Sequence, residues 1–315
     1  MTGERVEAER GGLPRRVRVW WAGLPDPSRR RILALLAAAV AVFIHLGAVG
    51  HEFVFDDNAI IQNNPLVHGL DRLPEVLTAP YWPGTYGPDA GLWRPATSGL
   101  YNLQWALWDG NPVGFNTVLI VLHGIATFLV TLLALELAPA AVALLAGMVF
   151  AVHPVHVEVT ANVVGTAEVL SALLVVAAAL VHVRGGARYG IGRALAVAVL
   201  YGLAFLSKEG SVTFLGLVFL LDAFRRDLRF RDLPDYVRRR WVTYALLVGV
   251  AVLVLLGRRA VLGTVASAIY PTGAHILTEV PRIWTVLTTW PFYVQLLVFP
   301  LELSADYGPR VIPIK

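Results

Sequence analysis

The chain has 315 residues, of which 57% are hydrophobic and 15% charged, and it contains no cysteine. Soluble domains average about 45–50% apolar and 25% charged residues, so this composition predicts one polytopic helical membrane domain. The lack of cysteine excludes a disulfide framework and a thiolate metal site. The net charge of +4 comes from basic residues beside apolar runs, where they report topology, so no nucleic-acid partner is predicted.

The first 113 residues predict a tail, a membrane span and a large loop. Residues 1–31 are rich in arginine and broken by Gly and Pro, as expected of a cytoplasmic tail. The apolar run 32–50 has no clear cleavage pattern and is longer than a signal-peptide core, so it predicts a first span with its N-terminus inside. Residues 51–113 then form an external loop with many aromatic residues, which suits the headgroup level. Within it, 71–79 predicts an interfacial helix with Leu73, Val76 and Leu77 toward lipid.

The remaining apolar runs bring the expected number of spans to about eight. Residues 115–137 and 140–152 form a tight hairpin around Ala138-Pro139, and 163–183 follows as the fourth span. One helix over 194–224 would be about 46 Å long, too long for a hydrocarbon core of about 30 Å, so a hairpin broken at 207–210 is preferred. The seventh and eighth spans are expected at 241–256 and 283–299.

Counting these spans places three polar breaks on the external face. They are Asp56-Asp57, the segment 153–158 and Lys208-Glu209, whereas the arginine-rich loop 225–240 lies in the cytoplasm. The positive-inside bias supports this count, because the count keeps the two basic loops, 184–193 and 225–240, on one side. Residues 32–315 are therefore predicted to form one transmembrane domain whose site opens on the external face, with membrane lipids around it.

Each polar break allows a chemical interpretation and a simpler structural one. Asp56 and Asp57 are candidates for a general base, or they begin a loop or cap a helix. His153, His156 and Glu158 could bind a metal, but they lack a strong spacing such as H-E-x-x-H, so a polar turn is preferred. No metal or cofactor is predicted, and a divalent ion is left open.

Carboxylates and cations further along the chain are candidates for binding a charged substrate. Glu168 lies inside the fourth span, where a carboxylate is a functional candidate by default or a neutral or paired group. Lys208 either meets an anionic lipid head or pairs with Glu209 in a turn. Arg94 suits bidentate phosphate binding, or it stacks on Trp93 or snorkels. Arg258 falls outside against the bias, as a mild exception or as a cation in use.

In combination these motifs resemble a known family. The motifs are an Asp-Asp pair after the first span, Trp93-Arg94-Pro95, Gly110-Asn111-Pro112, His153-Pro154-Val155-His156-Val157-Glu158, Gly165-Thr166-Ala167-Glu168, Ser207-Lys208-Glu209-Gly210 and Leu303-Ser304-Ala305-Asp306-Tyr307. The region 30–315 resembles the membrane portion of the transmembrane-and-tetratricopeptide-repeat O-mannosyltransferases, which have the GT-C fold. Two departures stand out: no 34-residue helical repeat is present, so a fragment is expected, and Thr166 stands where the family often has arginine.

The resemblance implies a glycosyltransferase that moves a hexose, expected to be mannose, from a polyprenyl-phosphate donor to a protein hydroxyl. Asp56 is the first candidate for the base and Asp57 the second. The leaving lipid phosphate needs cationic stabilisation more than a proton, which Lys208, Arg94 and Arg258 or Arg259 would supply. His156 and Glu158 would position the acceptor or polarise the sugar, and attack opposite the phosphate would invert the anomeric carbon.

Three alternatives remain open from the sequence. A transferase of the same fold could act on an envelope glycan or lipid. A transporter or flippase of a polyprenyl-linked lipid would be expected to carry charges at mid-membrane, often in two repeated halves, whereas here the charges gather at one face. An assembly scaffold would use the external loop to bind partners and would not depend on Asp56.

Overall fold

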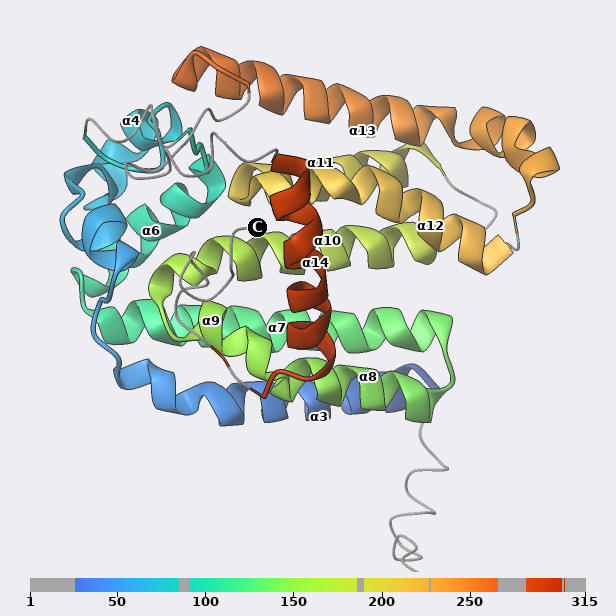
Figure 1. Ribbon diagram of the computed structural model, residues 1–315, viewed down its shortest axis with the longest axis horizontal. Helices are drawn as coiled ribbons and strands as arrows, with labels where there is room; N and C mark the ends of the chain where they lie inside the picture. Colours follow the sequence, from blue (N-terminus) through green and yellow to red (C-terminus); the bar gives the residue numbers. More distant parts are fainter. Residues whose placement is uncertain are drawn as a thin grey trace, which may run out of the picture.

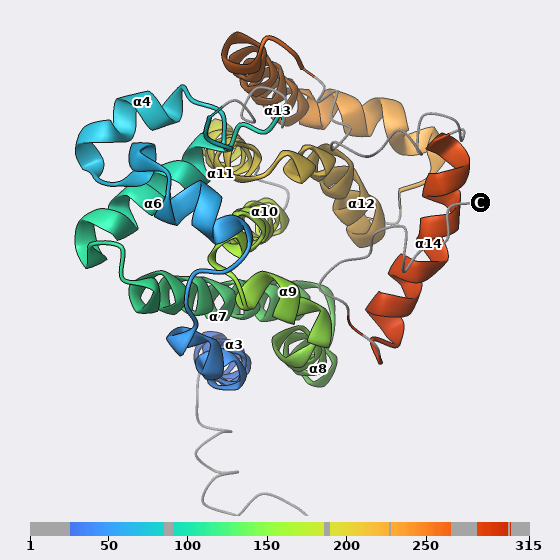
Figure 2. The same cartoon turned by 60° about the vertical axis from the view of Figure 1, so that its left-hand side comes forward.

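The computed structural model describes residues 26–84, 91–185, 190–226, 228–265, 282–301 and 303, and these are helices and connecting loops without a strand. The all-α fold class is confirmed. The helices of the bundle are α3 (Asp26–His45), α7 (Pro112–Leu137), α8 (Ala140–Val152), α10 (Thr166–Val183), α11 (Ile191–Ser207), α12 (Phe214–Arg226) and α13 (Leu233–Leu262). They lie roughly alongside one another, with α10 near the centre between α7 and α11 (Figures 1 and 2).

Local sequence signals explain where these helices begin and end. The side chain of Asn111 accepts a hydrogen bond from the Val113 N–H, and Pro112 occupies the first turn of α7, both typical of a helix start. The helix α7 ends ahead of Pro139, which separates it from α8. The helix α13 ends at Gly263, whose positive φ of 73° suits glycine.

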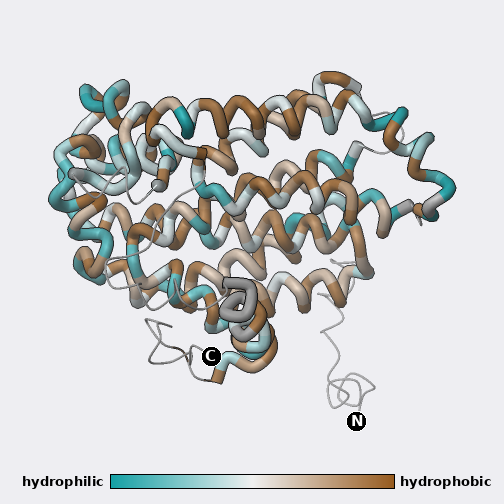
Figure 3. Tube along the Cα trace, turned by 45° about the horizontal axis from the view of Figure 1, so that its top comes forward, coloured by the Kyte–Doolittle hydropathy of each residue, from teal (hydrophilic) through white to brown (hydrophobic). Residues whose placement is uncertain are grey.

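Contacts between helix ends show that these seven helices alternate in direction. At one end of the bundle, Lys208 after α11 pairs with Glu168 in the first turn of α10. At the other end, Arg225 of α12 donates to the carbonyl of Val183, and Glu136 of α7 pairs with both Arg30 and Arg184. Figure 3 shows hydrophilic residues gathered toward the two ends and hydrophobic residues along the helices between them. The hairpin predicted around 207–210 is therefore confirmed.

The number of eight spans is not confirmed. Four described segments are long and apolar enough to cross a membrane, namely Asp26–Gly50, Pro112–Leu137, Val163–Val183 and Leu233–Leu262. The bent pair formed by α8 and Pro154–Thr160 would make a fifth. The helix α14 (Arg282–Val298), expected as the eighth span, runs across the other helices in Figures 1 and 2.

The loop between α3 and α7 folds as a cap over one end of the bundle. It contains the short turns Asn58–Gln62, Pro65–Val67 and Leu70–Arg72 and the helices α4 (Leu73–Leu77) and α6 (Pro95–Trp108). Its own core contains Ile60, Ile61 and Tyr101, packed against Phe115 of α7. Val76 was expected to face lipid, but it is buried in this core because the cap needs an apolar interior of its own. The part of the tail before Asp26 lies outside the described residues.

Candidate active site

The two adjacent aspartates occupy different environments. Asp57 is fully buried, and its carboxylate accepts hydrogen bonds from the backbone N–H groups of Val54, Val163 and Val164 at 3.2, 3.1 and 2.8 Å. Burial raises the pKa of Asp57, and these three hydrogen bonds oppose the rise. Asp57 therefore ties the start of the cap to the turn Val163–Gly165 that leads into α10.

Asp56 turns away from that anchor and lines a cavity of about 320 Å³. The cavity is also lined by Phe55, Glu158, Asn162 and Glu168, so three carboxylates surround it. Partial burial raises the pKa of Asp56 above its ordinary value of 3.8, since desolvation disfavours the charged form. Among the described residues Asp56 has no hydrogen-bond partner for its carboxylate, unlike Asp57. We name this space the carboxylate cavity.

The wall of the carboxylate cavity depends on a close approach of two backbone segments. A side chain at Gly165 would bring its Cβ to 2.1 Å from the carbonyl oxygen of Val159, so only glycine fits. The side chain of Asn162 accepts a hydrogen bond from the Gly165 N–H at 3.0 Å and donates to the Glu158 carbonyl at 2.8 Å. These contacts hold Val157–Thr160 (α9), which carries Glu158, beside the start of α10, which carries Glu168.

Lys208 brings a cation to Glu168, one of the residues that line this cavity. Its ammonium forms an ion pair with Glu168, and both side chains are about one-third exposed, at 31 and 34%. Lys208 itself adopts an extended backbone, with φ −153° and ψ 134°, and neighbouring side chains on extended backbone point in opposite directions. Glu209 therefore points elsewhere, and the Lys208–Glu209 ion pair that the sequence allowed does not form.

Glu209 instead receives Arg94 from the cap. The Arg94 guanidinium donates from Nε and Nη2 to the two carboxylate oxygens of Glu209 at 3.1 and 2.8 Å, and only 11% of the Arg94 side chain is exposed. Burial alone would raise the pKa of Glu209, but Arg94 outweighs it and lowers the value. The guanidinium also lies 4.9 Å from the ring centroid of Tyr81 and not on Trp93.

Arg258 lies at the same end of the bundle, but its guanidinium is hydrogen-bonded to the cap. It is buried on α13 and donates a hydrogen bond to the carbonyl of Gly91. Its charge interacts with those of Arg94 and Glu209. The three candidate cations thus differ: Lys208 pairs with Glu168, which lines the carboxylate cavity, whereas Arg94 and Arg258 join the cap to the helices.

His153 and His156 do not line the carboxylate cavity that Asp56 lines. The His153 ring accepts the Val155 N–H at 3.2 Å, and its other nitrogen lies 3.1 Å from the Leu297 carbonyl. The His156 ring packs 5.0 Å from His123 and 4.4 Å from Phe150. Within the described ranges, no three His, Cys, Asp or Glu side chains are grouped so that they could hold a metal ion.

A second buried ionic cluster lies at the opposite end of the bundle and was not predicted. The carboxylate of Asp222 lies 3.3 Å from His182 and 3.4 Å from Arg240, and the Tyr236 hydroxyl donates to it at 3.1 Å. The sequence places Arg240 in the cytoplasmic basic loop 225–240, but it lies on α13 and is 5% exposed because it pairs with Asp222 of α12. Asp222 within an apolar helix was the available signal, since a charged residue there needs a partner.

Comparisons with known proteins identify relatives of this chain. No protein-family model and no solved structure match it. It is 28% identical to a protein O-mannosyl-transferase of Caenorhabditis elegans over 281 residues, which cover 87% of this chain and 39% of that protein. With the protein O-mannosyl-transferase Tmtc1 of Drosophila melanogaster it is 34% identical over 189 residues, 59% of this chain and 22% of Tmtc1.

Tmtc2 of Drosophila melanogaster, also named a protein O-mannosyl-transferase, is 29% identical over 315 aligned residues, 93% of this chain and 33% of Tmtc2. The chain thus spans between 22 and 39% of the length of these three relatives. The resemblance that the motifs indicated is confirmed, and the chain is a relative of the protein O-mannosyl-transferases.

Proposed function

We propose that this chain is a membrane mannosyltransferase that moves a hexose from a polyprenyl-phosphate donor to a Ser or Thr hydroxyl of a protein. The observation that carries the proposal is the carboxylate cavity, in which Asp56 lies beside Glu158 and the Glu168–Lys208 pair. The relatives' names supply the sugar and the protein acceptor.

Asp56 acts as the general base in this proposal. Its raised pKa brings it closer to the range that is useful for taking a proton from a hydroxyl. The acceptor oxygen bonds to the anomeric carbon as the bond from that carbon to the phosphate oxygen breaks, and the acceptor proton passes to Asp56. Because the attack comes from the face opposite the phosphate, the anomeric carbon is inverted. Asp57 is excluded as the base here, since its oxygens already accept three backbone hydrogen bonds.

Lys208 stabilises the leaving lipid phosphate. It is a partly exposed cation paired with Glu168 of the cavity lining, and a phosphate could compete with Glu168 for its ammonium. Arg94 and Arg258 act less directly, by holding the cap against the helices that carry Lys208. Glu158 lines the cavity and positions the acceptor or the sugar. The roles assigned to His153 and His156 stay predictions, since neither lines the carboxylate cavity.

The site end of the bundle faces the exterior in this proposal, and the N-terminus lies in the cytoplasm. The basis is the charge bias, because Arg184, Arg225 and Arg238 belong to the opposite end.

The test is turnover of a polyprenyl-phosphate mannose by the purified chain, with Asp56→Asn and Glu52→Gln beside the wild type. Glu52 is an exposed carboxylate four residues away that does not line the carboxylate cavity, so Glu52→Gln is the matched control. Labelled sugar is followed into a membrane protein extract, and released lipid phosphate is measured. Loss of a general base is expected to slow transfer by about 10²–10⁴-fold in Asp56→Asn and to leave Glu52→Gln active.

Three outcomes would contradict the proposal. Equal turnover by wild type and Asp56→Asn removes Asp56 as the base. Lipid movement across a vesicle bilayer without sugar transfer replaces the enzyme with a transporter. Label in glycan or lipid but not in protein moves the acceptor to the envelope class.

A further inference from the structure

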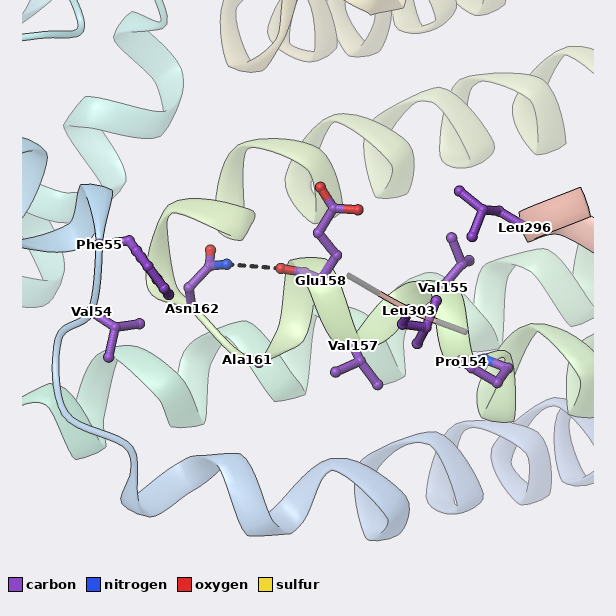
Figure 4. Close-up of a pocket in the computed structure, with 10 residues that line it drawn as sticks. All are labelled: Val54, Phe55, Pro154, Val155, Val157, Glu158, Ala161, Asn162, Leu296 and Leu303. Atoms are coloured by element: carbon purple, nitrogen blue, oxygen red, sulfur yellow. Dashed lines mark hydrogen bonds between the residues drawn. The ribbon is translucent and has the colours of Figure 1, made fainter. Parts of the chain in front are cut away.

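A second cavity adjoins the carboxylate cavity and has the opposite character. It has a volume of about 280 Å³, and its aliphatic lining comes mainly from Val54, Val155, Val157, Leu296 and Leu303. Phe55, Glu158 and Asn162 line both spaces, so the two cavities meet at these residues. Figure 4 shows Phe55 and Asn162 toward one end of this apolar cavity, with Val155 and Leu296 toward the other and Glu158 between them.

Phe55 stands at the junction in an unfavourable conformation. Its ring side chain is 79% exposed, and its backbone has a φ of +47°, which a bulky residue rarely adopts. The turn that holds it is fixed on both sides, because Asp57 N–H donates to the Val54 carbonyl at 2.9 Å and Val54 N–H donates to Asp57. Strain of this kind persists where the surroundings impose it and clusters at functional sites.

Neither folding nor local packing explains an aromatic ring at this position. Glycine would adopt the same φ without strain. Exposure of 79% leaves little of the ring to stabilise the fold, whereas Phe53, two residues earlier, is buried and packs on Phe115. The ring is therefore better explained by a ligand that it contacts.

We propose that Phe55 contacts the donor where the sugar phosphate joins the lipid, and that the apolar cavity takes the first isoprenoid segment of that lipid. This inference rests on the proposed function and specifies how its donor is held. A donor has a polar sugar and an anionic phosphate continuous with an apolar chain. The polar cavity, with Lys208 on Glu168 as the cation for the phosphate, continues into an apolar one and matches this order. An acceptor peptide has no such fixed polarity, so the two cavities favour the donor.

The decisive variant is Phe55→Gly, with Asp109→Gly as its matched control. Asp109 is the other described non-glycine residue with a positive φ, at 48°, and it caps α6 away from both cavities. Both variants relieve backbone strain, so neither is expected to lower the Tm, and a rise of up to about 4 °C is compatible with the relieved strain. Phe55→Gly is expected to raise the KM for a short-chain isoprenyl-phosphate mannose about tenfold, as for the loss of one buried aromatic contact. Asp109→Gly is expected to leave the KM unchanged.

A second variant addresses the apolar cavity itself. Ala161 lines that cavity and not the carboxylate cavity, so Ala161→Phe narrows only the space assigned to the lipid. This variant is expected to raise the KM for the isoprenyl donor with little change in kcat. If the KM of Ala161→Phe rises but its Tm also falls, the effect is structural and counts against the proposal.

Direct binding separates this inference from the proposed function. The probe is a short-chain isoprenyl phosphate without sugar, titrated into wild type, Phe55→Gly and Asp109→Gly in nanodiscs. Weaker binding by Phe55→Gly alone supports the inference even if no variant transfers sugar. Equal binding by all three overturns it, and so does a raised KM for the acceptor with an unchanged KM for the donor. Failure of wild-type turnover with normal Phe55-dependent binding overturns the proposed function alone.

Discussion

Two neighbouring residues of the same type, Asp56 and Asp57, lie in different environments in this molecule. The side chain of Asp57 is held by backbone N–H groups more than 100 residues away in the sequence, at Val163 and Val164. Asp56 faces a cavity. The pair could be singled out from the sequence, because two carboxylates after an apolar run need a reason, but the partners that distinguish them come from tertiary folding.

Asp57→Ala is expected to destabilise the chain by about 2–4 kcal/mol, because it removes the acceptor of three backbone hydrogen bonds and leaves those N–H groups unpaired. Equilibrium unfolding in mixed detergent measures the change. Asp57→Asn keeps one acceptor oxygen and should lose less, whereas Asp56→Ala should stay within about 0.5 kcal/mol of wild type. Equal losses at both positions would mean that Asp57 is not the anchor.

The raised pKa of Asp56 predicts the pH dependence of the reaction. The base works only when it is ionised, so kcat/KM should fall as the pH is lowered through the pKa of Asp56, above 3.8. The effect on stability has the opposite sign, because a pKa raised by folding makes the ionised form costly and stability falls as the pH rises through that pKa. Asp56→Asn should therefore lose the acid limb of the rate profile without a lower Tm at pH 7. A limb that survives in this variant would assign the titration to another group.

At the scale of helices, the break at Lys208-Glu209 could be predicted and the partners of the two residues could not. Helix length and charge bias require a reversal near 207–210, and α11 does end at Ser207. The extended backbone at Lys208 then separates the two side chains, one toward Glu168 and one toward Arg94. The sequence also allowed Arg94 to stack on Trp93, but Arg94 lies over Tyr81, because the cap brings Tyr81 to it.

The Arg94–Glu209 pair is expected to couple the cap to the helices. A double-mutant cycle of Arg94→Ala and Glu209→Ala should give a coupling free energy of about 1–3 kcal/mol in unfolding, since each residue leaves the other half-buried and unpaired. Arg72 and Glu75 supply the matched control. They form an exposed pair with a distance of 3.1 Å from Nη1 of Arg72 to Oε2 of Glu75, and a coupling free energy of about 0.5 kcal/mol or less is expected for them. Coupling energies of equal size for both pairs would show that Arg94 does not anchor the cap.

At the scale of the whole molecule, the alternation of the first seven predicted spans follows from length and charge alone. What the sequence could not show is which charges turn inward. Arg240 belongs to a run of three arginines that suggests a solvated surface, yet the turn of α13 brings that one residue onto Asp222. The helix α14 also departs from the prediction, because it lies across the bundle and not along it.

The alternation and its orientation can be tested together because the chain has no cysteine. Single cysteines at Glu52 and Asp71 mark the site end, those at Arg184 and Arg239 mark the opposite end, and all four positions are exposed. A cysteine at Ala143, which is fully buried, is the control and should react only after denaturation. An impermeant thiol reagent added to intact cells is expected to label positions 52 and 71, and to label 184 and 239 only after permeabilisation. Labelling of 184 and 239 alone would keep the alternation and reverse the proposed orientation. Labelling of one position from each pair would contradict the alternation itself. In the structure Glu136 pairs with both Arg184 and Arg30, and Arg240 of α13 pairs with Asp222, so positions 184 and 239 lie at the same end of the bundle.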